Sequence, residues 1–135
     1  MNWVLNIEST VYSIVEAKAY PDIVAEFPDV YFTTLDDLGE KPSFPTVYIH
    51  AMQNSENGAD LEGLGTNGVL ASFEAVVTVN TNQQDAKKVM SVVFDAFKSI
   101  RFGCQMMPII TRSNNLYVAT ARFRRMIGAN DNLNL

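Results

Sequence analysis

The chain has 135 residues, of which 47% are apolar and 19% are charged, as in globular proteins and unlike disordered ones. At this length we expect one domain over residues 1–135, which buries roughly two thirds of its unfolded surface. Ten Lys and Arg against fifteen Asp and Glu give a net charge of −5. This acidic balance argues against a nucleic-acid-binding protein, because phosphates attract basic surfaces.

Membrane and metal signals are lacking in the sequence. Residues 1–6 do not have the basic start and apolar core of a signal peptide, and no apolar run approaches the ~20 residues of a membrane span. One Cys and one His are too few for a disulfide or a structural zinc site. We therefore expect no cofactor, no metal and assembly in a reducing cytoplasm.

Helical and strand patterns alternate in the first half of the chain. Apolar residues at helical spacing predict a helix over 3–19, which Pro21 is expected to end or kink. β-Branched and aromatic residues predict strands over 30–34 and 47–52. Residues 54–68 are polar and hold four of the seven glycines, so we expect a long mobile loop with a functional reason for its length.

The second half contains the clearest strand pattern. Apolar and polar residues alternate over 71–81, and a capping-box pattern at Thr81 and Gln84 predicts a helix over 82–100. Gly103 is expected to stop this helix. Strands are then predicted over 106–111 and 116–127, joined by a short turn, and residues 128–135 are expected to form a flexible tail.

These elements predict an α+β domain. Its sheet should be mainly antiparallel with four to five strands, and the long loop should lie between strands two and three. Each helix has one apolar stripe, so both helices are expected to pack on one face of the sheet.

Two chemical motifs occur without the context that their chemistry needs. Residues 63–68 read G-L-G-T-N-G and match a dinucleotide-binding fingerprint, but a polar loop precedes them and a strand pattern follows, where a helix is required. Cys104 and His50 could form a thiol–base pair. The simpler interpretation is a small packed Cys and a His on the polar side of a strand.

Two carboxylate pairs are candidates for acid–base or metal sites. Asp36 and Asp37 are adjacent, and Asp60 lies two residues before Glu62. Neither pair has the spacing of a calcium loop or a nearby His, and adjacent carboxylates in turns are usually solvated. The sequence thus indicates a protein that is not an enzyme.

The last strands contain two features that suggest a subunit contact. Arg122, Arg124 and Arg125 form the only basic cluster, with Arg122 and Arg124 on one face of the strand. They are either solvated or bound to an acidic neighbouring subunit. Residues 106–110 are apolar in both phases of a strand, which suggests that a partner covers the second face.

In order and pattern the chain resembles the tail-terminator, or tail-completion, proteins of long-tailed phages and phage-tail-like particles. The resemblance covers residues 4–127 and is carried by an N-terminal helix, F-P-D-V-Y at 27–31, F-P-T-V-Y-I at 44–49, a long loop, F-E-A-V-V-T-V at 73–79, a helix at 85–100 and L-Y-V-A-T-A-R-F at 116–123. No invariant chemical motif defines this family.

The resemblance implies a virion subunit, assembled in the host cytoplasm, that forms a ring. The ring, usually a hexamer, ends the tail tube and receives the head–tail connector protein, while DNA passes through it without specific binding. No catalytic residue is implied. The candidate interface comprises Asn54, Asp60, Leu61, Glu62, Leu64, Met106, Arg122, Arg124 and Arg125, and deletion of residues 60–65 should leave a folded monomer whose tails overgrow or fail to join heads.

Two other functions remain open from the sequence. The chain could be another ring or adaptor of the phage neck, such as the head–tail connector itself. It could also be a ferredoxin-like domain that binds a small molecule, although such a site would need convergent polar groups in a pocket.

Overall fold

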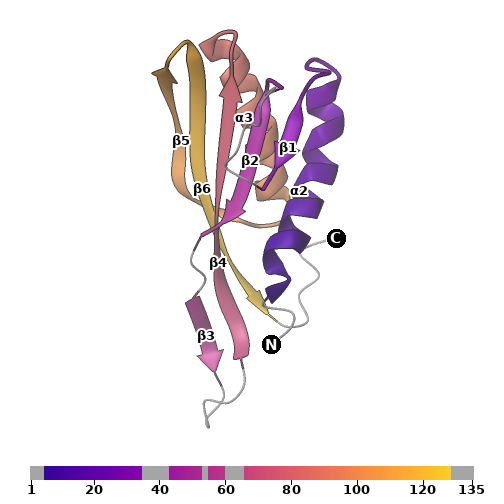
Figure 1. Cartoon of the computed structure of the whole chain (residues 1–135). Helices are drawn as coiled ribbons and strands as arrows, with labels where there is room; N and C mark the ends of the chain where they lie inside the picture. The colour runs from indigo at the N-terminus through magenta and orange to yellow at the C-terminus, as the bar shows by residue number, and fades with distance from the viewer. Residues whose placement is uncertain (1–4, 35–42, 53–54, 60–65, 129–135) are drawn as a thin grey trace.

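The computed structural model of the protein describes residues 5–34, 43–52, 55–59 and 66–128 (Figure 1). In chain order its elements are α2 (Ile7–Val24), β1 (Tyr31–Thr33), β2 (Thr46–Ala51), β3 (Ser55–Ala59), β4 (Thr66–Val79), α3 (Gln83–Ser99), β5 (Gly103–Ser113) and β6 (Leu116–Gly128). The predicted α+β class is confirmed. Each predicted helix and strand has a counterpart here, and β3 is an addition.

The strands form one mixed sheet in the order β1-β2-β4-β6-β5, and β3 pairs with the beginning of β4. Only β1 and β2 are parallel, and the other pairings are antiparallel. A mainly antiparallel sheet was expected and is present. Strands β1 and β5 therefore lie at its two opposite edges.

Part of the segment predicted as a long loop forms a hairpin. Ser55 pairs with Leu70 and Ala59 pairs with Thr66, so β4 begins within the predicted loop. The glycines and asparagines here have low strand propensity, but a neighbouring strand can override that preference. The loop prediction is wrong for 55–59 and 66–68, while residues 60–65 lie outside the described part of the chain.

Both helices cover the same face of the sheet, as predicted (Figure 1). Helix α3 packs on β4, β5 and β6, and α2 packs on β2. Between them and the sheet lie four phenylalanines with at most 1% of their surface exposed: Phe73, Phe97, Phe102 and Phe123. The rings of Phe97 and Phe123 stack with centroids 4.3 Å apart, and burial of such large rings stabilises the fold strongly.

Helix α2 extends beyond its predicted end. It runs to Val24 with Pro21 inside it, although proline removes one helical hydrogen bond. Ile23 is 2% exposed, and its contact with the core holds the last turn in place. Of the two expected effects of Pro21, an end of the helix is wrong, because this tertiary contact outweighs the local preference; the expected kink stays a prediction.

Each end of α3 differs from the prediction by one residue. Asn82, and not Thr81, caps the helix, because its side-chain oxygen accepts a 2.9 Å hydrogen bond from the Asp85 backbone N–H. At the other end Arg101 adopts a left-handed φ of 67°. Gly103 is the first residue of β5, so its prediction as a helix stop is wrong.

The β5–β6 hairpin has the predicted short turn. Asn114 and Asn115 have φ values of 48° and 69°, which a two-residue type I′ turn requires and which asparagine tolerates. Strand β6 includes Gly128, which the sequence had assigned to the flexible tail. Residues 129–135 lie outside the described part of the chain.

Candidate functional site: the open face of the sheet

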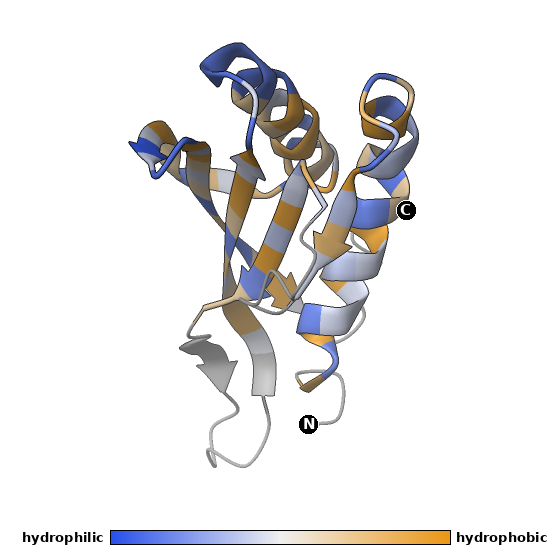
Figure 2. Cartoon of the chain, turned by 45° about the horizontal axis from the view of Figure 1, so that its top comes forward, coloured by the Kyte–Doolittle hydropathy of each residue, from blue (hydrophilic) through white to orange (hydrophobic). Residues whose placement is uncertain are grey.

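The sheet has one face under the helices and one open face. Along β4 the side chains of Phe73, Ala75 and Val77 are fully buried, whereas Glu74 and Val76 between them are partly exposed. This alternation follows from the period of a strand, and Figure 2 shows it as alternating apolar and polar bands along the ribbons. Residues on the open face are accessible to a partner.

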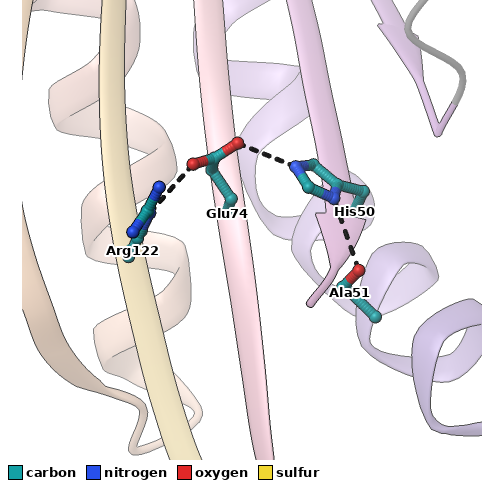
Figure 3. Close-up of polar contacts among 4 residues, drawn as sticks. All are labelled: His50, Ala51, Glu74 and Arg122. Atoms are coloured by element: carbon teal, nitrogen blue, oxygen red, sulfur yellow. Dashed lines mark hydrogen bonds and ion pairs between the residues drawn. The ribbon is translucent and has the colours of Figure 1, made fainter. Parts of the chain in front are cut away.

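A polar cluster lies at the centre of the open face (Figure 3). Glu74 is the middle residue, with His50 on β2 to one side and Arg122 on β6 to the other. Glu74 Oε1 lies 2.8 Å from His50 Nε2, and Oε2 accepts a 2.9 Å hydrogen bond from Arg122 Nε. The ring of Tyr48 stacks on His50 at 4.6 Å. Three strands are thus joined side by side.

This arrangement favours the charged form of Glu74. Burial raises the pKa of the carboxyl group, but hydrogen bonds and charges from His50 and Arg122 lower it more, so its pKa lies below the ordinary value. His50 Nδ1 also lies 3.3 Å from the Ala51 carbonyl oxygen. Both carboxylate oxygens are engaged, so Glu74 serves as an ion-pair centre and is poorly suited as a general base.

The structure separates the predicted basic cluster. Arg122 and Arg124 pair with Glu74 and Ser72 of β4 and share the open face, as predicted, while Arg125 pairs with Ala71 and lies on the helix-covered side. Arg122 binds Glu74 of its own chain, although the sequence had offered an acidic neighbouring subunit as its partner. The partner of Arg122 is thus a residue of the neighbouring strand, which the linear sequence does not reveal.

The remaining interface candidates divide into two groups. Met106 pairs with Arg122 and is half-buried. The others lie outside the described part of the chain: Asn54, Asp60, Leu61, Glu62 and Leu64. Met107 and Ile109, on either side of Pro108, are 66% and 52% exposed, so the protein itself leaves parts of this apolar run uncovered.

The two rejected motifs lack the required geometry. Cys104 pairs with Phe123, on the helix-covered side, whereas His50 pairs with Glu74 on the open face. The thiol and the imidazole therefore do not meet. Gly68, the last glycine of the nucleotide-like motif, lies in strand β4 and not at a helix start, while Asp36 and Asp37 lie outside the described residues.

Several surface grooves accompany the helices. One of about 490 Å³ lies between α2 and α3 and includes the 2.9 Å ion pair of Lys88 with Glu26. Another, of about 330 Å³, lies between α3 and β5 and is mostly apolar, with Phe94, Met90 and Met107 in its wall. Among the described residues, no group of three or more His, Cys, Asp or Glu could hold a metal ion.

Sequence reasoning missed the Glu74 cluster. The alternation of residues 47–52 predicts that His50 lies on the polar side of its strand, but it does not predict which strands flank it. The one signal was Glu74 itself, an acidic residue in the middle of an otherwise apolar and weakly polar strand. Such a charge is typically paired when it is mostly buried.

Neither the known protein-family models nor the curated proteins contain a match to this chain. Within the described ranges, neither helix has the length and apolar character needed to cross a membrane. Functional inference therefore depends on the residues and surfaces of this protein.

Proposed function

We propose that this protein is a structural subunit of a phage tail, which forms a ring on the last ring of the tail tube and ends its growth. The ring then provides the surface on which the head–tail connector protein docks. Two features support this function: the order of helices and strands, which resembles that of tail-terminator proteins, and the shape of the subunit. No catalytic role is proposed for any residue.

The observation that carries the proposal is the hairpin of β3 and β4. Strand β4 is 14 residues long. It pairs with β6 from Gly68 to Val79, and its beginning, Thr66–Leu70, also pairs with β3, which projects beyond the two helices (Figure 1). An arm that leaves the body of the subunit can reach a neighbouring copy or the tube below. The arm occupies the segment from which the sequence had suggested an assembly contact.

Exposed apolar side chains support an assembly role. Among the described residues the large ones are Leu5, Tyr20, Tyr31, Met107, Ile109 and Met126. Scattered apolar residues are normal on a monomer. Leu5 precedes α2, but the others lie on α2, β1, β5 and β6 towards the two edges of the sheet. Surfaces of this kind suit repeated contacts in a ring.

The proposed partners are further copies of the chain, in a hexameric ring, together with the tail-tube and connector proteins. DNA would pass through the ring without specific binding. The net charge of −5 suits such a passage, because an acidic lining repels the phosphates of a duplex.

The native mass of the purified protein, alone and with tail-tube protein, tests this function. We expect a ring-sized complex with tube protein, whereas the protein alone can be monomeric. A stable complex with the head–tail connector and none with the tube would instead identify the protein as another ring of the neck. No complex with either partner would refute the proposal.

A further inference from the structure

Two segments of the protein carry opposite charge. Residues 101–128, which contain β5 and β6, carry five arginines and no other charged residue. Residues 7–29, which contain α2 and the turn after it, carry five acidic residues and one lysine. The basic set is Arg101, Arg112, Arg122, Arg124 and Arg125, and the acidic set is Glu8, Glu16, Asp22, Glu26 and Asp29.

The segments that carry these two sets lie on opposite sides of the molecule. Arg122 binds Glu74 and Arg125 lies on the helix-covered side, so the exposed arginines are Arg101, Arg112 and Arg124. In the acidic set, Glu26 pairs with Lys88. Strand β5 is one edge of the sheet and β1 is the other, and α2 lies beside β1 while α3 lies over β4, β5 and β6 (Figure 1). We call residues 101–128 the arginine edge, and α2 with residues 25–33 the tyrosine edge. The protein is therefore basic at one edge and acidic at the other.

The tyrosine edge combines its acidic residues with exposed aromatic rings. Tyr20 and Tyr31 are 42% and 49% exposed, and the ring of Tyr20 meets Phe32 at 6.1 Å. The pKa of Tyr12 is raised to about 12, mainly by burial and in addition by the neighbouring Glu16 and Tyr31. Rings and carboxylates thus share one surface.

The arginine edge has the complementary composition. Met107 and Ile109 are its exposed apolar residues, and Arg112 lies 5.7 Å above the ring of Tyr117, which shows that an arginine here already stacks on a tyrosine. Tyrosine and arginine are among the side chains most enriched where protein partners bind strongly. The arginines of one edge could therefore bind the carboxylates and tyrosine rings of the other edge.

We infer that the arginine edge of one copy binds the tyrosine edge of the next. The inference rests on the proposed function and names the contact by which the ring would close. Within one molecule β5 runs antiparallel to β1, as the chain of pairings from β1 through β2, β4 and β6 shows. A copy placed alongside in the same orientation therefore brings β5 next to an antiparallel β1. Such a head-to-tail contact can repeat until it closes.

A second copy fits these edges better than two other occupants do. A two-fold dimer through the arginine edge would place like charges opposite each other, which disfavours it. A nucleic acid would match the arginine edge only, and the protein as a whole carries a net charge of −5. A second copy offers opposite charge to both edges at once.

Charge reversal at each edge tests the contact. One variant combines Arg112→Glu with Arg124→Glu, and the other combines Glu16→Lys with Asp29→Lys. Self-association is measured by sedimentation velocity at high protein concentration and low ionic strength, where charge contacts are strongest. We expect the wild type to associate and either variant alone to associate roughly 30-fold more weakly.

An equimolar mixture of the two variants is the decisive experiment. In the mixture each reversed edge meets its complement on the other variant, so association should return towards the wild-type level. Lys87→Glu with Lys98→Glu on the exposed side of α3 makes the same net change as the arginine variant and should leave association unchanged. Thermal melting of each variant confirms that the fold is intact.

Three results would overturn the inference: a wild type that stays monomeric under these conditions, reversals that do not weaken association, or a mixture that does not recover. Loss of duplex DNA binding in the arginine variant with unchanged self-association would overturn it in favour of a nucleic-acid contact. Rings that form on tail tubes despite both reversals would refute the contact and leave the proposed function standing. Copies that associate through these edges but do not bind the tail tube would refute the proposed function and leave the contact between the edges standing.

Discussion

The replacement Glu74→Gln should destabilise the protein measurably at neutral pH. The side chain of Glu74 is 17% exposed and holds His50 at 2.8 Å and Arg122 at 2.9 Å. Glutamine has the same shape as glutamate but no charge. Its NH₂ group would replace one of the two carboxylate oxygens and so face a nitrogen of His50 or Arg122. Charge-assisted hydrogen bonds of this kind support a loss of about 1–2 kcal/mol in the free energy of unfolding. For a domain of this length that is a fall in melting temperature of about 4–7 °C.

The pH dependence of this difference follows from the direction of the pKa shift. The pKa of Glu74 is lowered in the folded protein, so the ion pairs stabilise the fold above the ordinary carboxyl pKa. That contribution is lost as the pH falls through the folded-state pKa, because the protonated carboxyl resembles glutamine. The stability of the wild type should therefore approach that of Glu74→Gln in acid.

Urea unfolding, followed by circular dichroism at several pH values, measures both effects. Glu26→Gln is the matched control, because Glu26 pairs with Lys88 at the same 2.9 Å but is 56% exposed. Water and salt screen exposed ion pairs, so this control should change stability by less than Glu74→Gln. Equal stabilities of the wild type and Glu74→Gln at neutral pH would refute the assigned role of the cluster.

Three further changes probe other parts of the structure. Asn82→Ala removes the cap of α3 and should lower the free energy of unfolding by about 1 kcal/mol in urea unfolding; no change would contradict the cap. Phe97→Ala empties the centre of the aromatic core and should cost about 3–5 kcal/mol, so a small loss in the same assay would argue against that packing. Tyr12 has its pKa raised to about 12, so Tyr12→Phe should remove a late-ionising tyrosine from an ultraviolet absorbance titration of the folded protein. Since that shift favours the neutral phenol, Tyr12 also adds to the loss of wild-type stability between pH 10 and 12.

The sequence predicted those elements in which local pattern and burial agree. Strand β4 alternates over residues 71–79 because one of its faces lies under the helices, and α3 has a single buried stripe that includes Val89, Val93 and Phe97. The periods of strand and helix make such segments readable. The short turn at Asn114 and Asn115 was predictable for a similar local reason.

The remaining features depend on contacts between distant segments. His50 and Arg122 lie 24 and 48 residues from Glu74, so their meeting requires the strand order and register. Strand β3 has little strand propensity of its own and is held by β4. Helix α2 passes Pro21 because Ile23 is buried beyond it. Local rules cannot anticipate such effects of tertiary structure.

Electron microscopy of tail tubes assembled with and without this protein tests the central claim most directly. If the protein ends the tube, tubes assembled with it should be shorter and more uniform in length, and each should carry a ring at one end. Tubes with an unchanged length distribution and bare ends, in the presence of folded protein, would contradict the account.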